Sequence, residues 1–122
     1  MGFEIAEVAR DFERNAGHEI LYSEMVCNQF VVAVLRKAVD PSFRMILADE
    51  FPTSPSFMKV DAPQAGDLVH WRGHIGIVLD PDRGDFIGSQ TSTGVATANY
   101  KHGYWNGAYH GKKPDCFLRY LH

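Results

Sequence analysis

The fold is decided by the stretch Gly73-His74-Ile75-Gly76-Ile77-Val78-Leu79, which predicts a β-strand over residues 74–80. Side chains alternate between the two faces of a strand, so the three aliphatic residues at 75, 77 and 79 share one face. That face is apolar and belongs in a core. On the other face His74 is followed by Gly76, which has no side chain and leaves room for another element to approach. The pattern predicts a histidine beside a gap.

Further strands are predicted on both sides of this stretch. Arg72-Gly73 makes a tight turn before it, and the segment 80–85, rich in Asp, Pro and Gly, makes a turn after it. A polar link, Thr91-Ser92-Thr93-Gly94, separates the next two strands. The predicted strands are 67–71, 74–80, 86–90, 95–100 and 117–121, and the Gly- and aromatic-rich segment 101–114 is a loop.

Two helices are predicted before the strands. Residues 2–15 have apolar side chains at helical spacing, and residues 24–39 repeat the pattern, with Ser23 as N-cap and Asp40-Pro41 as the end. The intervening stretch 41–66 lacks periodicity apart from one short helical piece, and predicts an ordered loop. Helices followed by an antiparallel meander predict an α+β domain of about five strands, with residues 1–122 forming a single domain.

Composition excludes several classes of protein. The chain has 122 residues, 45% of them hydrophobic, and a formal charge of -3 without a basic block, so binding to nucleic acid through phosphate contacts is not expected. No apolar run reaches the roughly 20 residues that span a bilayer. The start of the chain lacks the pattern of a secretory signal. We therefore expect synthesis in the cytoplasm, with delivery to the periplasm or cell wall by a signal-independent route.

Cys27 is the first candidate for chemistry. It falls in the first turn of the helix predicted over 24–39, where free backbone N–H groups favour negative charge and lower the pKa of a thiol. Asn28 follows directly, so this helix end is polar and is expected to face a cleft and contact substrate. Cys116 lies in an alternating, strand-like run, which is typical of a small buried hydrophobe. No disulfide between the two is predicted.

His74 is the matching candidate base, because an imidazole within reach of a thiol can take its proton and later return it. Such a base needs a third group that holds its ring. If the strand over 86–90 pairs with that over 74–80, its far end returns beside His74. Gln90 is the preferred partner and Ser89 the reserve, with the choice left open by the register; an ordinary strand-end role is the alternative for both.

Four segments in this order resemble the NlpC-type papain-like cysteine peptidases, and also their relatives the CHAP amidases and the type VI secretion amidase effectors. The segments are Val26-Cys27-Asn28-Gln29-Phe30-Val31, Pro63-Gln64-Ala65-Gly66-Asp67-Leu68-Val69, Gly73-His74-Ile75-Gly76-Ile77-Val78 and Phe86-Ile87-Gly88-Ser89-Gln90. The resemblance covers about residues 20–100. It implies a papain-like fold and a peptidoglycan amidase or endopeptidase that cleaves cell-wall stem peptides, with an immunity protein as partner if the chain is an injected effector.

The resemblance also implies roles for single residues. It makes Cys27 the nucleophile and His74 the base. The third catalytic position of the family is often a second histidine, and Gly88 aligns with it here, which implies a shift to Ser89 or Gln90. Tyr22 is the nearest match to a tyrosine that lines the active site in the family, and a flanking core aromatic is the alternative.

Two other functions compete with the hydrolase. Six histidines and many carboxylates offer metal ligands, but His70 and His74 flank a turn rather than share a helix face, so neither a metal nor another cofactor is expected. Alternation predicts His70 on the sheet surface. The aromatic residues of 101–114 suit stacking on sugars, which favours a non-catalytic cell-wall or carbohydrate-binding module on the same fold. Such a loop is also compatible with the rim of a substrate cleft.

Overall fold

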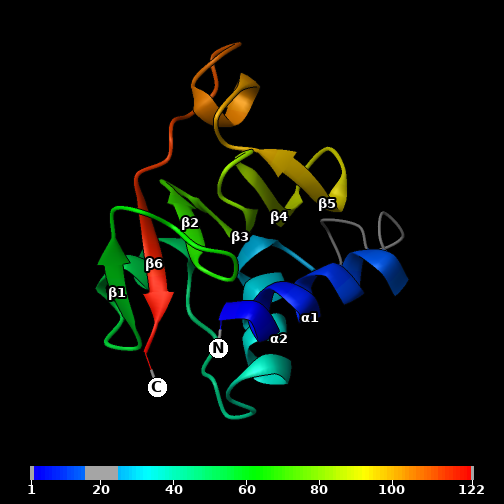
Figure 1. The fold of residues 1–122 in the computed structure, drawn as a ribbon, viewed down its shortest axis with the longest axis vertical. Helices are drawn as coiled ribbons and strands as arrows, with labels where there is room; N and C mark the ends of the chain where they lie inside the picture. Colours follow the sequence, from blue (N-terminus) through cyan, green and yellow to red (C-terminus); the bar gives the residue numbers. More distant parts are fainter. Residues whose placement is uncertain (1, 16–24, 122) are drawn as a thin grey trace.

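The computed structural model describes residues 2–15 and 25–121 (Figure 1). These residues form two α-helices, two 3-10 helices and a sheet. The helices are α1 (Gly2–Asn15) and α2 (Cys27–Ala38), and the 3-10 helices are η2 (Ala48–Thr53) and η3 (Gly103–Asn106). The strands are β1 (Phe57–Val60), β2 (Leu68–Trp71), β3 (His74–Asp80), β4 (Asp85–Gln90), β5 (Gly94–Asn99) and β6 (Cys116–Tyr120).

The strands form one antiparallel sheet in the order β1-β6-β2-β3-β4-β5. Both α-helices lie on the same side of it, where α2 contacts β3 and β4 (Figure 1). This confirms the α+β class. The sheet has one strand beyond the predicted set, because β1 falls in the stretch 41–66 that was expected to be a loop. Its four residues, close to prolines, form a strand by pairing with the distant β6, which no local pattern reveals.

Helix α2 begins at Cys27, later than the predicted residue 24. The Gln29 side chain helps to define this start, because its Oε1 accepts the backbone N–H of Val26 at 3.0 Å. The predicted cap, Ser23, lies outside the described residues. As predicted, Cys27 stands in the first turn. The N-terminal N–H groups of α2 are therefore available to the thiol and to any ligand bound beside it.

Both faces of the central strands β2, β3 and β4 are buried. On the helix side, aliphatic residues of β3 and β4 such as Ile75 and Ile87 pack against α1 and α2, which confirms the predicted core face. On the far side, a second core gathers around Trp71 and Phe86, and Trp105 from η3 packs against it. His74, Gly76 and Val78 belong to this far face by alternation. The face expected to carry a gap is thus covered by the aromatic loop of residues 101–114.

The Gly-Asp-Leu-Val segment is a clamp for the start of β2. Asp67 is only 3% exposed, and its carboxylate accepts hydrogen bonds from Arg119 Nε at 3.0 Å and Nη2 at 2.8 Å. It also accepts the backbone N–H of Gln64 at 2.7 Å. Gly66 has φ +92, and a Cβ there would overlap the backbone of Gly2, so the turn requires glycine. The clamp fixes the start of β2 against β6, and backbone hydrogen bonds of Gly66 and Asp67 with Val78 join the same segment to β3, the strand that carries His74.

None of the helices in the described parts of the chain is long and apolar enough to cross a bilayer.

Candidate active site

The Cys27 thiol lies at the first residue of α2 and is buried. Burial raises its pKa above the ordinary value, and this effect outweighs the opposing backbone N–H groups of Ile75, Asn28 and Cys27 itself. The negative charge of Asp49 raises the pKa further. The expectation that the helix start lowers this pKa is therefore wrong for the resting protein. The N–H groups act as predicted, but desolvation of the thiolate has the stronger influence on the pKa.

The hydrogen bond from Ile75 places the thiol at the level of the sheet. N–H groups alternate in direction along a strand, and that of Val78 points toward β2, where it donates to Asp67 O at 2.7 Å. The N–H of Ile75 therefore points the other way, toward β4. The paired residues of β3 and β4 begin only at Ile77, so Ile75 lies before this ladder. The thiol itself belongs to the core on the helix side of the sheet.

His74 is 6% exposed and lies under aromatic rings. Its ring stacks on Trp105 with centroids 4.5 Å apart and an interplanar angle of 17°, and Trp71 lies 5.5 Å away. Burial lowers the pKa of His74 to about 4, with smaller electrostatic contributions from Lys112 and His70. The imidazole is therefore neutral at physiological pH, which is the form a general base needs.

Gln90 lies beside His74, as predicted. Among the described residues, the buried side-chain atoms His74 Nε2 and Gln90 Oε1 both lack a hydrogen-bond partner. A Cβ built on Gly88 would lie 2.7 Å from Gln90 Oε1 and 3.5 Å from His74 Nε2, so the two atoms converge on this empty position. The Gln90 amide nitrogen donates to Ala96 O at 3.2 Å, which leaves the oxygen as acceptor toward the ring. Gly88 thus provides the space that Gln90 uses.

Ser89 faces the other side of the sheet. It pairs with Val95, a residue of the helix-side core, and its hydroxyl donates to the carbonyl of Met25, just before the catalytic helix. The structure therefore does not bring Ser89 to the ring of His74. Its observed contact holds the chain that leads into Cys27.

Of the other two predicted site residues, only Asn28 lies in the described part of the chain. Asn28 Nδ2 donates to Ile46 O at 2.9 Å, which ties the start of α2 to the following loop. Its role in substrate contact stays a prediction. Tyr22 lies outside the described residues.

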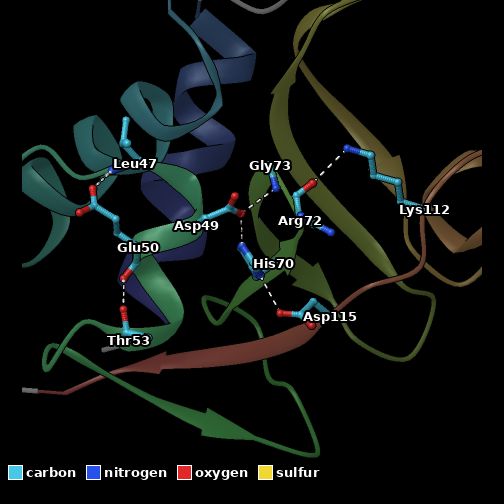
Figure 2. A network of polar contacts seen from close by, with 9 residues as sticks. All are labelled: Leu47, Asp49, Glu50, Thr53, His70, Arg72, Gly73, Lys112 and Asp115. Atoms are coloured by element: carbon cyan, nitrogen blue, oxygen red, sulfur yellow. Dashed lines mark hydrogen bonds and ion pairs between the residues drawn. The ribbon is translucent and has the colours of Figure 1, made fainter.

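The prediction that His70 lies on the sheet surface is wrong. His70 is 4% exposed, because carboxylates cover both ring nitrogens (Figure 2). Nε2 lies 3.0 Å from Asp49 Oδ1, and Nδ1 lies 3.1 Å from Asp115 Oδ2. Asp49 Oδ1 also accepts the backbone N–H of Gly73 at 2.7 Å, and this N–H and the bond to His70 lower the pKa of Asp49. The network fixes the turn that precedes His74.

One group of side chains in the described chain has donor atoms spaced closely enough to hold a metal ion. Donor atoms of His70, Asp115 and Cys116 lie within 4.8 Å of one another. The contact between His70 and Asp115 is a hydrogen bond at 3.1 Å. Burial and Asp115 raise the pKa of the Cys116 thiol, which disfavours the thiolate that a metal requires. The hydrogen-bond network accounts for these contacts without an ion.

Replacing His70 by Ala should lower the free energy of unfolding by about 2–3 kcal/mol, because it leaves a cavity and removes two hydrogen bonds to carboxylates. Urea denaturation measures the change. Asp11→Asn is the control, because it breaks an exposed ion pair in which the Asp11 side chain is 44% exposed and the Arg14 side chain 65%. This change should lower the free energy of unfolding by less than about 0.5 kcal/mol. Equal losses in the two variants would show that the His70 network does not stabilise the fold.

In the resting arrangement, the Cys27 thiol and the His74 imidazole are both neutral. The hydrogen bonds of the described residues include none between the Cys27 thiol and the His74 ring; the N–H of Ile75, the next residue after His74, acts on the pKa of the thiol. The thiol–imidazole pair stays a prediction. The observed arrangement is a protonated sulfur beside a strand that begins with an unprotonated imidazole.

Comparison with known proteins adds one finding. The sequence profile of the NlpC/P60 family matches residues 16–113, which include Cys27, His74 and Gln90. No curated protein matches the chain.

Proposed function

Because the chain belongs to the NlpC/P60 family, we propose that it hydrolyses amide bonds in the stem peptides of peptidoglycan with Cys27 as nucleophile. The family has a papain-like fold, consists generally of cysteine peptidases and amidases, and indicates a cell-wall hydrolase. The observation that carries the finer proposal is the thiol at the start of α2, near enough to the N–H of Ile75, the residue after His74, for that N–H to lower its pKa. It supports a nucleophile and a base on neighbouring elements.

The proposed reaction starts from the neutral pair. Cys27 Sγ attacks the amide carbonyl while its proton passes to His74, so no isolated thiolate has to form in the buried site. Backbone N–H groups of Cys27 and Asn28, free at the helix start, stabilise the oxyanion. Protonated His74 then gives its proton to the leaving amine. Water, deprotonated by His74, attacks the thioester, releases the new carboxyl group and restores the thiol.

Gln90 holds the imidazole in this scheme. Its Oε1 accepts a hydrogen bond from His74 Nε2–H and leaves Nδ1 as the atom that takes the proton. The two unpaired buried atoms beside Gly88 support this pairing. It also accounts for the glycine at the position where the family often has a histidine, since any side chain there would displace Gln90.

A digest of defined muropeptides, read by mass spectrometry, tests the function. The protein should release fragments that carry one new amine and one new carboxyl group, and the fragments should reveal which bond is cut. Peptidoglycan of several chemotypes should be included, because stem peptides differ in their third residue and cross-link. If none of these substrates yields a fragment, the assignment to peptidoglycan hydrolysis is wrong.

Replacing Gln90 by Ala should lower kcat by roughly 10- to 100-fold, because the imidazole loses the group that fixes its orientation and tautomer. Gly88→Ala should have a similar effect, since its Cβ would lie 2.7 Å from Gln90 Oε1. In the double variant, Gly88→Ala should add little to Gln90→Ala, because the side chain that it displaces is already gone. Steady-state kinetics on one muropeptide measures all three; additive losses would contradict the coupling.

A non-catalytic module is the second candidate. Tyr104 and Tyr109 are 45% and 86% exposed in the aromatic loop, which suits contact with sugars. This candidate requires that Cys27→Ala retain the whole function, whereas the hydrolase requires that it lose turnover and keep binding. Pull-down on insoluble peptidoglycan, run beside the digest, separates the two.

The site of action is part of the proposal. We expect the chain to act at the cell wall, with an immunity protein as partner if it is an injected effector. Expression in bacteria with and without an added export signal tests this. Lysis should require both the export signal and an intact Cys27; lysis without export would contradict it.

A further inference from the structure

A hollow of about 400 Å³ opens beside the candidate active site. Its walls are the turn 91–93, Thr97 and Ala98 of β5, and the aromatic pair Tyr104 and Trp105 of η3, with Gln90 at one end. This volume lies within the range of small-ligand sites.

Two side chains that line the hollow also lie beside His74, the proposed base. Trp105 lines the hollow and stacks on His74 at 4.5 Å. Gln90 lines it as well, and its Oε1 converges with His74 Nε2 on the empty position at Gly88. The backbone of η3 is anchored separately, since Trp71 Nε1 donates to Trp105 O at 3.0 Å. A group bound in the hollow would therefore contact Trp105 and Gln90, the two side chains beside the imidazole.

The walls are uncharged. The turn 91–93 offers hydroxyl groups, and Tyr104 presents an aromatic ring that is 45% exposed. The nearby carboxylate of Glu13 is bound by Thr97, through its N–H at 2.8 Å and its hydroxyl at 3.0 Å. Hydroxyls and an aromatic ring without a counter-charge suit a neutral, polar ring rather than an ion.

Two other hollows of the described chain have charged residues in their walls and lie away from the candidate active site. One is lined by the Asp67–Arg119 clamp, and the other includes Asp40 and Arg44. Neither is lined by Cys27 or by a residue in contact with its proposed base. The uncharged hollow is therefore the better candidate for substrate.

We propose that this hollow is a subsite for a sugar ring of peptidoglycan, so that the enzyme prefers stem peptides still linked to their glycan. The proposal rests on the proposed function and names the substrate class of the same site. Stem peptides carry free carboxylates and amines, which would lose hydration against these walls without gaining a partner. The sugars of the glycan carry hydroxyls and neutral acetamido groups, which hydrogen-bond to Thr and Ser and pack on Tyr104.

A matched substrate pair tests the subsite: a disaccharide-linked stem peptide and the same peptide without the disaccharide. We expect kcat/KM to be roughly tenfold or more higher for the glycan-linked form, since a sugar contact adds binding energy of that order. Tyr104→Ala should raise KM for the glycan-linked substrate by roughly tenfold and leave the free peptide unchanged. Thr91→Val, which removes one exposed turn hydroxyl, should act in the same direction without risk to the core.

Tyr109→Ala is the matched control, because Tyr109 is 86% exposed in the same loop but does not line the hollow. Its kinetics should equal those of the unmodified protein on both substrates. Equal cleavage of the two substrates, or equal losses on both in the Tyr104 and Thr91 variants, would overturn the subsite while leaving the hydrolase intact. Cleavage of neither substrate would instead count against the proposed function.

Discussion

Cys27→Ala should abolish hydrolysis, with kcat reduced by roughly 10⁴-fold or more, because the covalent intermediate of the proposed reaction forms on the Cys27 sulfur. The fold should persist. The change removes only one buried sulfur, at a cost of about 1 kcal/mol. The measurement is release of new amines from muropeptides, with circular dichroism and thermal unfolding run on the same sample.

Cys116→Ala is the control for that experiment. Cys116 stands at the start of β6, and its thiol contacts Asp115 rather than the catalytic helix. It should keep activity within about twofold, because this partly buried thiol packs against the core away from the site. Full activity in Cys27→Ala, or equal losses in both cysteine variants, would refute Cys27 as nucleophile.

His74→Ala should lower kcat by roughly 10³- to 10⁴-fold, because both proton transfers then pass to water. For the unmodified protein, activity should fall on the acid side as His74 becomes protonated, around its pKa of about 4 rather than near 6.5. The kcat/KM profile of the free enzyme measures this midpoint. A midpoint near 6.5 would show that the imidazole is hydrated in solution, contrary to its place beneath Trp105.

The same histidine should make the fold sensitive to acid. Between pH 6.5 and about 4 the unfolded chain binds a proton on His74 that the folded protein does not, so the free energy of unfolding falls as pH drops through this window. The shift corresponds to about 3 kcal/mol. His74→Gln, which cannot titrate, should flatten this part of the dependence. Urea denaturation across the window compares the two proteins, and parallel curves would contradict a buried neutral imidazole.

The sequence was most informative where one local rule acts alone. Strict alternation predicted β3 to its boundaries, and the polar start of the second helix placed Cys27 in a first turn. The return of β4 beside β3 placed Gln90 near His74, because an antiparallel hairpin leaves little freedom once its turn is known. The family resemblance pointed to the same residues and is confirmed by the match over 16–113.

The remaining features depend on contacts between distant segments. His70 is buried because Asp49 and Asp115, far apart in sequence, both reach its ring. Trp105 covers His74 through a loop whose path has no periodicity to read. The direction of the Cys27 pKa shift required a balance between helix N–H groups and burial, and the extent of burial is a property of the packed molecule. Local patterns carry none of this information.

The buried, protonated state of the Cys27 thiol also affects its oxidation. Peroxide and disulfide reagents attack thiolates, so the resting Cys27, which is 5% exposed and has a raised pKa, should be oxidised slowly. An enzyme built in this way can pass through an oxidising environment, such as the space around a bacterial wall, without first being converted to a sulfenic acid. In the proposed reaction, the Cys27 sulfur becomes reactive only when a substrate carbonyl lies next to the imidazole.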